Sequence, residues 1–170
     1  MGWWCCMSSL LGILQRRKVV PDDLLTSQLF NERGFYQAFM GDLKRCTDEV
    51  IIESPYITTT RVNALLPVLT KLSKQGVKIT VNTRHPKDHD ELLRIQAWMA
   101  IKKLRPLGIR VRFFTDYHHR KIAVIDGRIL WEGSLNILSQ SHSREIMRRI
   151  ESVELAEQMV RFLGLRRFWQ

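Results

Sequence analysis

Apolar residues recur along the chain at two different spacings, and segments of the two kinds alternate. Spacings of three and four residues predict amphipathic helices, whereas short apolar runs and alternation with polar residues predict strands. In chain order the expected elements are a helix from Asn31, a strand over 50–52, a helix around 65–72 that stops at Gly76, a strand over 77–81, a helix over 90–104, strands over 109–113, 122–125, 129–131 and 146–150, and a helix from Ser152. This order predicts the α/β class, with a mixed central sheet and helices on both faces.

The beginning of the chain lacks this alternation. Residues 1–14 are largely apolar, and a basic stretch over 16–18 follows them. The apolar segment is shorter than the roughly 20 residues of a membrane-spanning helix, and it lacks the basic start of a secretory signal. Three interpretations stay open: an interfacial membrane anchor, a packing arm, or the start of a chain derived from a longer protein. We assign residues 1–30 to an apolar arm with a linker, and residues 31–170 to a single domain.

Charge narrows the choice of partner. The 170 residues include 27 Lys and Arg against 17 Asp and Glu, which gives a formal net charge of +10. Such an excess favours a polyanionic partner, with nucleic acid ahead of an anionic membrane surface. The three cysteines, Cys5, Cys6 and Cys46, form neither an even set nor a metal-ligand pattern. Their number argues against a disulfide framework and predicts a cytoplasmic protein, with membrane association through residues 1–18 as the alternative.

The most informative chemistry begins just before the expected strand over 122–125. His119, Lys121 and Asp126 have the spacing H-x-K-x4-D. Side chains two residues apart on a strand point to the same face, so an imidazole and an ammonium group lie side by side. One can act as a nucleophile while the other binds a phosphate oxygen. Asp126-Gly127 is a hairpin signal, which returns the chain along the strand over 129–131.

A second group of polar residues follows this hairpin. Gly133, Ser134 and Asn136 spell G-S-x-N, and the hairpin brings Ser134 and Asn136 to the same end of the sheet as His119. Hydroxyl and amide groups can both donate hydrogen bonds to phosphate oxygens. Glu145, beyond a polar loop, is placed to accept the Nδ1 proton of His119 and to leave Nε2 free to attack.

Together these residues closely resemble the signature of the phospholipase D superfamily, and most nearly that of its small single-motif members of the bacterial endonuclease type. The resemblance spans about residues 31–165 and implies the phospholipase D-like α/β/α sandwich. It implies that His119 is a nucleophile that forms a phosphohistidine, and that Lys121, Ser134 and Asn136 bind phosphate. It also implies that Glu145 orients the histidine. Asp126 is the acidic residue of the motif, and we expect it to hold the loop rather than to touch substrate.

The resemblance further implies a phosphodiesterase, with a metal-independent endonuclease on DNA or RNA as the first interpretation. One alternative is a phospholipase D-type lipid phosphodiesterase, which the apolar start and its basic flank favour. Another is a non-catalytic nucleic-acid-binding module that kept the fold. Cleavage through a covalent intermediate needs a second acid and base, and this chain carries one motif. We therefore expect a homodimer with its active site on the twofold axis.

A metal site is the remaining possibility for this chemistry. His85, Asp88 and His89 lie close together in the sequence. Pro86 interrupts the helix that would align the two histidines, and no third histidine follows at a usable spacing. We therefore expect neither a metal nor a cofactor.

Overall fold

A computed structural model describes residues 27–114, 119–139 and 143–165. The apolar arm over 1–18 and most of the linker after it lie outside the described residues, so the assignment of residues 1–30 stays a prediction. Among the described helices, none has both the length and the apolar character needed to cross a bilayer.

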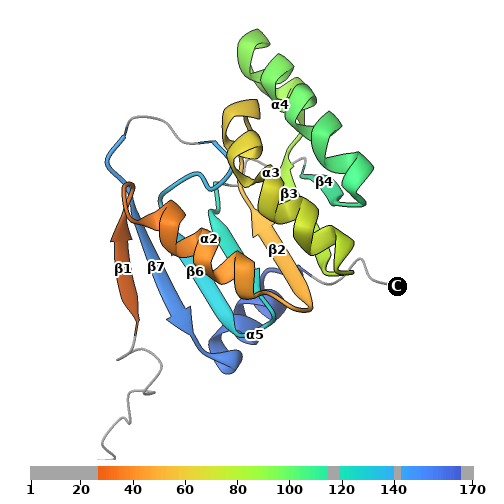
Figure 1. Cartoon of the computed structure of the whole chain (residues 1–170). Helices are drawn as coiled ribbons and strands as arrows, with labels where there is room; N and C mark the ends of the chain where they lie inside the picture. Colours follow the sequence, from red (N-terminus) through yellow and green to blue (C-terminus); the bar gives the residue numbers. More distant parts are fainter. Residues whose placement is uncertain (1–26, 115–118, 140–142, 166–170) are drawn as a thin grey trace, which may run out of the picture.

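The described chain forms a seven-stranded sheet with the order β1-β7-β6-β5-β2-β3-β4 (Figure 1). Strands β2, β3 and β4 run parallel, and all the other neighbouring pairs are antiparallel, which confirms the predicted mixed sheet. The strands are β1 (Gln28–Asn31), β2 (Glu49–Glu53), β3 (Lys78–Arg84), β4 (Arg110–Phe114), β5 (Ile122–Ile125), β6 (Ile129–Gly133) and β7 (Ile146–Glu151).

Helices cover both faces of this sheet, as predicted (Figure 1). On one face lie α2 (Phe35–Arg45), α3 (Thr59–Lys74) and α4 (Glu91–Leu104), and on the other lies α5 (Val153–Phe162); short 3-10 turns are η1 (Pro86–Asp88) and η2 (Arg105–Leu107). The side chains of β2 alternate between two apolar clusters. Val50 and Ile52 pack with the three-helix side, whereas Ile51 packs with α5. This alternation explains why the strand reads as an unbroken apolar run.

The start of the domain differs from the expectation. The helix begins at Phe35 rather than near Asn31, and Asn31 instead ends strand β1, which pairs with β7. The side-chain oxygen of Asn31 accepts hydrogen bonds from the backbone N–H groups of Arg33 (3.1 Å) and Gly34 (3.0 Å). Asparagine stabilises turns in this way as well as the first turns of helices. Its presence alone therefore does not distinguish a turn after a strand from the start of a helix.

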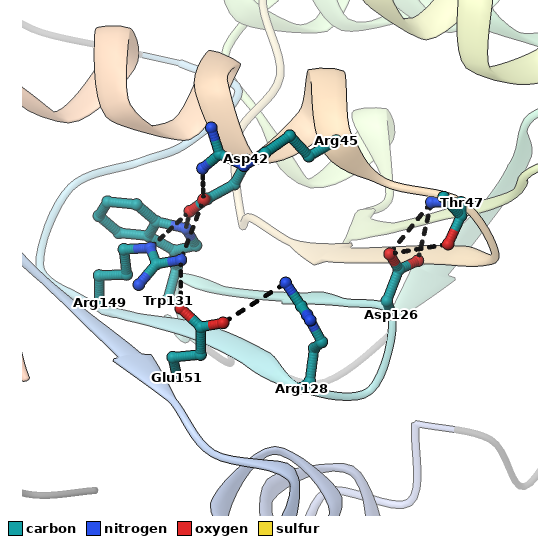
Figure 2. A network of polar contacts seen from close by, with 8 residues as sticks. All are labelled: Asp42, Arg45, Thr47, Asp126, Arg128, Trp131, Arg149 and Glu151. Atoms are coloured by element: carbon teal, nitrogen blue, oxygen red, sulfur yellow. Dashed lines mark hydrogen bonds and ion pairs between the residues drawn. The ribbon is translucent and has the colours of Figure 1, made fainter.

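A buried carboxylate connects helix α2 to the sheet. Asp42 is 1% exposed, and it accepts hydrogen bonds from the indole of Trp131 on β6 (2.8 Å) and from Arg149 on β7 (2.8 and 3.1 Å). Arg45 and Glu151 extend this network at its edges (Figure 2). Because a buried charge is tolerated only when it is paired, these contacts fix how α2 lies over β6 and β7.

The hairpin between β5 and β6 is anchored by its first turn residue. Asp126 and Gly127 have φ angles of 51° and 61°, and the N–H of Arg128 donates to the carbonyl of Ile125 (3.1 Å). The Asp126 carboxylate accepts hydrogen bonds from the backbone N–H groups at the start of β2, on Thr47, Asp48 and Glu49, at 2.8–3.3 Å. Figure 2 shows its contacts with Thr47. The turn is therefore tied to the connection between α2 and β2.

Replacing Asp126 by Asn should lower the free energy of unfolding by about 1–3 kcal/mol. The substitution replaces a charged carboxylate, which accepts several backbone N–H groups, by a neutral amide that accepts them less strongly. Asn tolerates a positive φ, so the turn itself is retained. Urea denaturation measures the change, with Asp48→Asn at a neighbouring exposed carboxylate as the control. A loss equal to that of the control would contradict the anchoring role.

The same contact predicts a pH dependence. Burial acts to raise the pKa of Asp126, but hydrogen bonds from the Cys46 thiol and from the backbone of Asp48, Glu49 and Thr47 hold it below its ordinary value. A lowered pKa in the folded state stabilises the protein above the unfolded pKa of about 3.9, and this stabilisation is lost as the pH falls through the folded value. The stability difference between wild type and Asp126→Asn should therefore shrink when urea titrations are repeated below about pH 4.

Candidate active site

The predicted residues gather where several strand ends meet. The parallel strands β2 and β3 end at one edge of the sheet, and the antiparallel pairing brings the start of β5, the end of β6 and the start of β7 to that same edge. His119 and Lys121 precede β5, Ser134 and Asn136 follow β6, and Glu145 precedes β7. This edge therefore collects five of the six predicted site residues.

His119 is exposed, and Lys121 beside it is half-buried. The Lys121 ammonium donates a hydrogen bond to the backbone carbonyl of His119 (2.5 Å). Burial lowers the pKa of Lys121, while the Glu145 carboxylate acts to raise it. The ring of Tyr56, from the loop after β2, lies edge-on to the His119 ring with 6.2 Å between the centroids. An exposed imidazole and an ammonium group thus share one face of the sheet edge.

Glu145 lies next to Ser134. Hydrogen bonds from the Ser134 and Ser143 hydroxyls, followed by the charge of Lys121, hold the pKa of Glu145 below its ordinary value. Ser134 also accepts a hydrogen bond from the backbone N–H of Ile146 (3.2 Å). Within the described residues no hydrogen bond joins Glu145 to His119, so the orienting role of Glu145 stays a prediction.

Asn136 has a free polar atom inside the protein. Its side-chain oxygen is buried and has no hydrogen-bond partner among the described residues. Its backbone carbonyl, by contrast, accepts a hydrogen bond from the Tyr36 hydroxyl (3.3 Å), which positions the loop. Since buried polar atoms nearly always have partners, this oxygen retains capacity to accept a hydrogen bond from a donor group.

Gly133 allows β6 and β7 to meet beside this group. A Cβ atom on Gly133 would lie 2.2 Å from the carbonyl oxygen of Ile146 and 2.9 Å from Cα of Met147. Both are backbone atoms, so no side-chain rotation could relieve the clash. The glycine of the G-S-x-N pattern is therefore required by the close approach of strand β7, which Glu145 precedes.

Comparisons with known proteins agree with this arrangement. The family model described as cardiolipin synthase, PLD-like domain, matches residues 39–166, which is more than half of the chain. The chain belongs to the phospholipase D-like family. A search of curated protein sequences gives no match.

Solved structures resemble the chain in fold. Nuc, a phospholipase D family member from Salmonella typhimurium, aligns with a TM-score of 0.65 at 14% identity, covering 81% of this chain and 90% of that one. NucT from Helicobacter pylori gives 0.63 at 15% identity, with 80% and 91% covered. Phosphatidylserine synthase from Haemophilus influenzae gives 0.58 at 14% identity, with 79% and 38% covered. These matches confirm the predicted phospholipase D-like α/β/α sandwich.

Asp126, the last residue of the phospholipase D-like motif, is not brought to the site. It lies at the other end of β5, five residues beyond Lys121, or roughly 16 Å along an extended strand. Its carboxylate is occupied by the backbone before β2, as described above. The structure thus places Asp126 as an anchor of the hairpin, in agreement with the expected loop-holding role, and it does not place it among groups that could contact substrate.

An ion pair that the sequence pattern does not reveal lies directly behind the site. Glu53, the last residue of β2, is fully buried and forms a salt bridge with Arg120, the middle residue of the H-x-K segment. Arg120 is one residue out of phase with His119 and Lys121, so it leaves the sheet on the α5 side. The pair therefore holds the segment from behind. An acidic residue that ends an apolar strand was the available signal, but its partner lies 67 positions away.

The metal interpretation of His85, Asp88 and His89 finds no geometric support. In the described ranges, no group of three or more His, Cys, Asp or Glu side chains is arranged to hold a metal ion. His85 instead caps η1, since its Nδ1 accepts a hydrogen bond from the backbone N–H of Lys87 (3.0 Å).

Replacing Gly133 by Ala should destabilise the protein by about 1–3 kcal/mol or more, because the added methyl group must push β6 away from β7. Gly41→Ala is the matched control. Its Cβ would meet only the end of the Arg45 side chain, at 3.6 Å, inside helix α2. Alanine is preferred there, so the control should be neutral or slightly stabilising in urea denaturation. Equal effects of the two changes would contradict the packing argument.

Proposed function

We propose that the chain is a phosphodiesterase that cleaves nucleic acid through a phosphohistidine at His119. The observation that carries the proposal is the meeting of His119, Lys121, Ser134 and Glu145 at one sheet edge. Membership of the phospholipase D-like family supports phosphodiester chemistry at this site.

The proposed reaction has two steps. Nε2 of His119 attacks phosphorus, an N–P bond forms, and the bond from phosphorus to the leaving oxygen breaks as that oxygen takes up a proton. Water then attacks the phosphohistidine and releases the phosphate and the imidazole. Lys121, the Ser134 hydroxyl and the Asn136 amide stabilise charge on the phosphate oxygens, so these side chains supply the electrostatic stabilisation. Glu145 keeps the imidazole oriented.

A second imidazole completes this scheme. The leaving oxygen needs a proton and the attacking water must lose one, yet the chain carries a single H-x-K motif. We propose a homodimer in which the active site lies on the twofold axis and His119 of the other copy supplies the acid and base. A twofold interface brings the same surface of both chains together, and an exposed His119 at a sheet edge is compatible with that arrangement.

Nucleic acid is the preferred substrate because of charge. The net charge of +10 attracts a polyanion, and Nuc and NucT are similar in fold over most of their length. A lipid phosphodiesterase is the second candidate. A cavity of about 440 Å³ reaches Lys121 from the α5 side of the sheet, and its lining combines the apolar side chains of Leu29, Ile122 and Ile146 with the charged side chains of Arg120, Glu132 and Arg148, a mixture of the kind that a lipid with a charged headgroup requires.

A cleavage assay in EDTA tests the proposal, with single-stranded DNA, plasmid, RNA and phosphatidylcholine vesicles offered in parallel. We expect cleavage of nucleic acid, and we expect His119→Ala to reduce it at least about a thousandfold because the nucleophile is lost. Lys44→Ala, an exposed lysine in the last turn of α2, is the control for loss of positive charge. Release of the lipid headgroup without cleavage of nucleic acid would show that the substrate is a lipid. DNA binding without cleavage of any substrate would show that the protein is a non-catalytic nucleic-acid-binding module.

A mixed dimer tests the shared site. The purified protein should have about twice the 20.0 kDa mass of one chain in light scattering. Dimers that pair a wild-type copy with a tagged His119→Ala copy should lose nearly all cleavage, since both imidazoles take part in each reaction. Half of the wild-type rate would mean that each copy acts alone, and a monomeric active enzyme would also contradict the proposal.

A further inference from the structure

Aromatic rings extend away from His119 along one side of the site. Tyr56 lies 6.2 Å from the His119 ring and 5.1 Å from the His89 ring, measured between centroids. On the other side of turn η1, His85 lies 4.7 Å from Phe113 and 5.8 Å from Trp98. Turn η1 connects His85 to His89, so we treat these rings as one group, which we call the aromatic row: Tyr56, His89, His85, Phe113 and Trp98.

The aromatic row differs from the aromatic core of the protein. Phe35, Phe39 and Trp131 pack against one another on the sheet and are 0% exposed. In the row, by contrast, Trp98 is 41% exposed and the other rings are half-buried. Ring surface therefore remains open to a ligand along this side of the site, which ordinary core packing does not explain.

Positive charge accompanies the rings. The exposed cations are Lys87 in η1 and Arg94 on α4, one helical turn before Trp98; Arg84, whose guanidinium lies 5.9 Å from the centre of the Tyr56 ring, is buried, and the carboxylates of Asp88 and Asp90 are exposed in the same segment. Exposed rings with exposed cations nearby suit a chain of bases joined by phosphates, because bases can stack on the rings while the cations attract the phosphates. A lipid headgroup offers no comparable series of flat partners.

The charge state of His89 fits stacking. Burial, followed by the positive charge of Arg84, lowers the pKa of His89, so its ring is uncharged at neutral pH. A neutral imidazole in contact with Tyr56 offers a flat apolar surface rather than a phosphate ligand.

We infer that the aromatic row binds the bases of a single-stranded nucleic acid next to the phosphodiester that His119 attacks. In a duplex the bases are stacked on one another and paired, so their faces cannot reach these rings unless the strands separate. The inference rests on the proposed function for the position of the cleaved bond, and it adds a preference for single strands and a direction in which the strand leaves the site.

Equilibrium binding tests the aromatic row without relying on turnover. In the His119→Ala background and in EDTA, fluorescence anisotropy compares a short labelled DNA strand with a strand of equal length that carries abasic positions, and with the duplex. One stacked base contributes about 1 kcal/mol or more, which corresponds to roughly fivefold or more in affinity. We expect the abasic strand and the duplex to bind at least that much more weakly.

Variants of one ring then locate the effect. Trp98→Ala should remove most of the discrimination between the normal and the abasic strand, and Trp98→Phe should keep it because a ring remains. Phe162→Ala is the matched control, since Phe162 is an 84% exposed aromatic residue on α5. Circular dichroism melting verifies that each variant is folded.

Three results would overturn the inference. The first is equal affinity for the normal and the abasic strand, which needs no variant to observe. The second is discrimination that Trp98→Ala leaves intact. The third is a loss of binding to phosphatidylglycerol vesicles in Trp98→Ala while strand binding is unchanged, which would assign the rings to a lipid surface. Discrimination without cleavage by the wild-type protein would refute the proposed function alone, and cleavage without discrimination would refute the aromatic row alone.

Discussion

Strand β5 is held at both of its ends by carboxylates whose partners lie far away in the sequence. At the turn, Asp126 accepts hydrogen bonds from the backbone before β2, and at the other end Glu53 of β2 pairs with Arg120. Both contacts join β2 to β5, so together they fix the register of these two strands as well as the distance between them. The positions of His119 and Lys121 follow from this register, because these residues flank Arg120 on the opposite face.

This arrangement separates the acidic residues that support the candidate site from the side chains that lie in it. Glu53 and Asp126 work from behind the site and from the far end of the strand, whereas Glu145 lies within it beside Ser134 and Lys121. Asp42 stabilises helix α2 over β6 and β7 in the same way. Carboxylates that pair with distant residues thus hold the strand next to the exposed histidine and the half-buried lysine.

The parts of the fold that are encoded locally could be predicted, and those that depend on distant pairing could not. The hairpin after Ile125 follows from its apolar runs and the Asp126-Gly127 turn, and it carries most of the site with it. Strand β1 has little apolar pattern of its own and exists through pairing with β7, so it was missed. The Glu53–Arg120 pair and the rings around Tyr56 likewise join residues that only the folded sheet brings together.

The anchor at Asp126 has a further consequence for the chemistry of Cys46. Burial, together with the hydrogen bond to Asp126 and the charge of that carboxylate, raises the pKa of the Cys46 thiol to about 12. The thiolate is the nucleophile that attacks an alkylating reagent, so this protonated sulfur is protected for as long as the turn stays docked. The rate at which Cys46 becomes labelled therefore reports how often β5 detaches from the α2–β2 connection, and the chain carries its own probe of that opening.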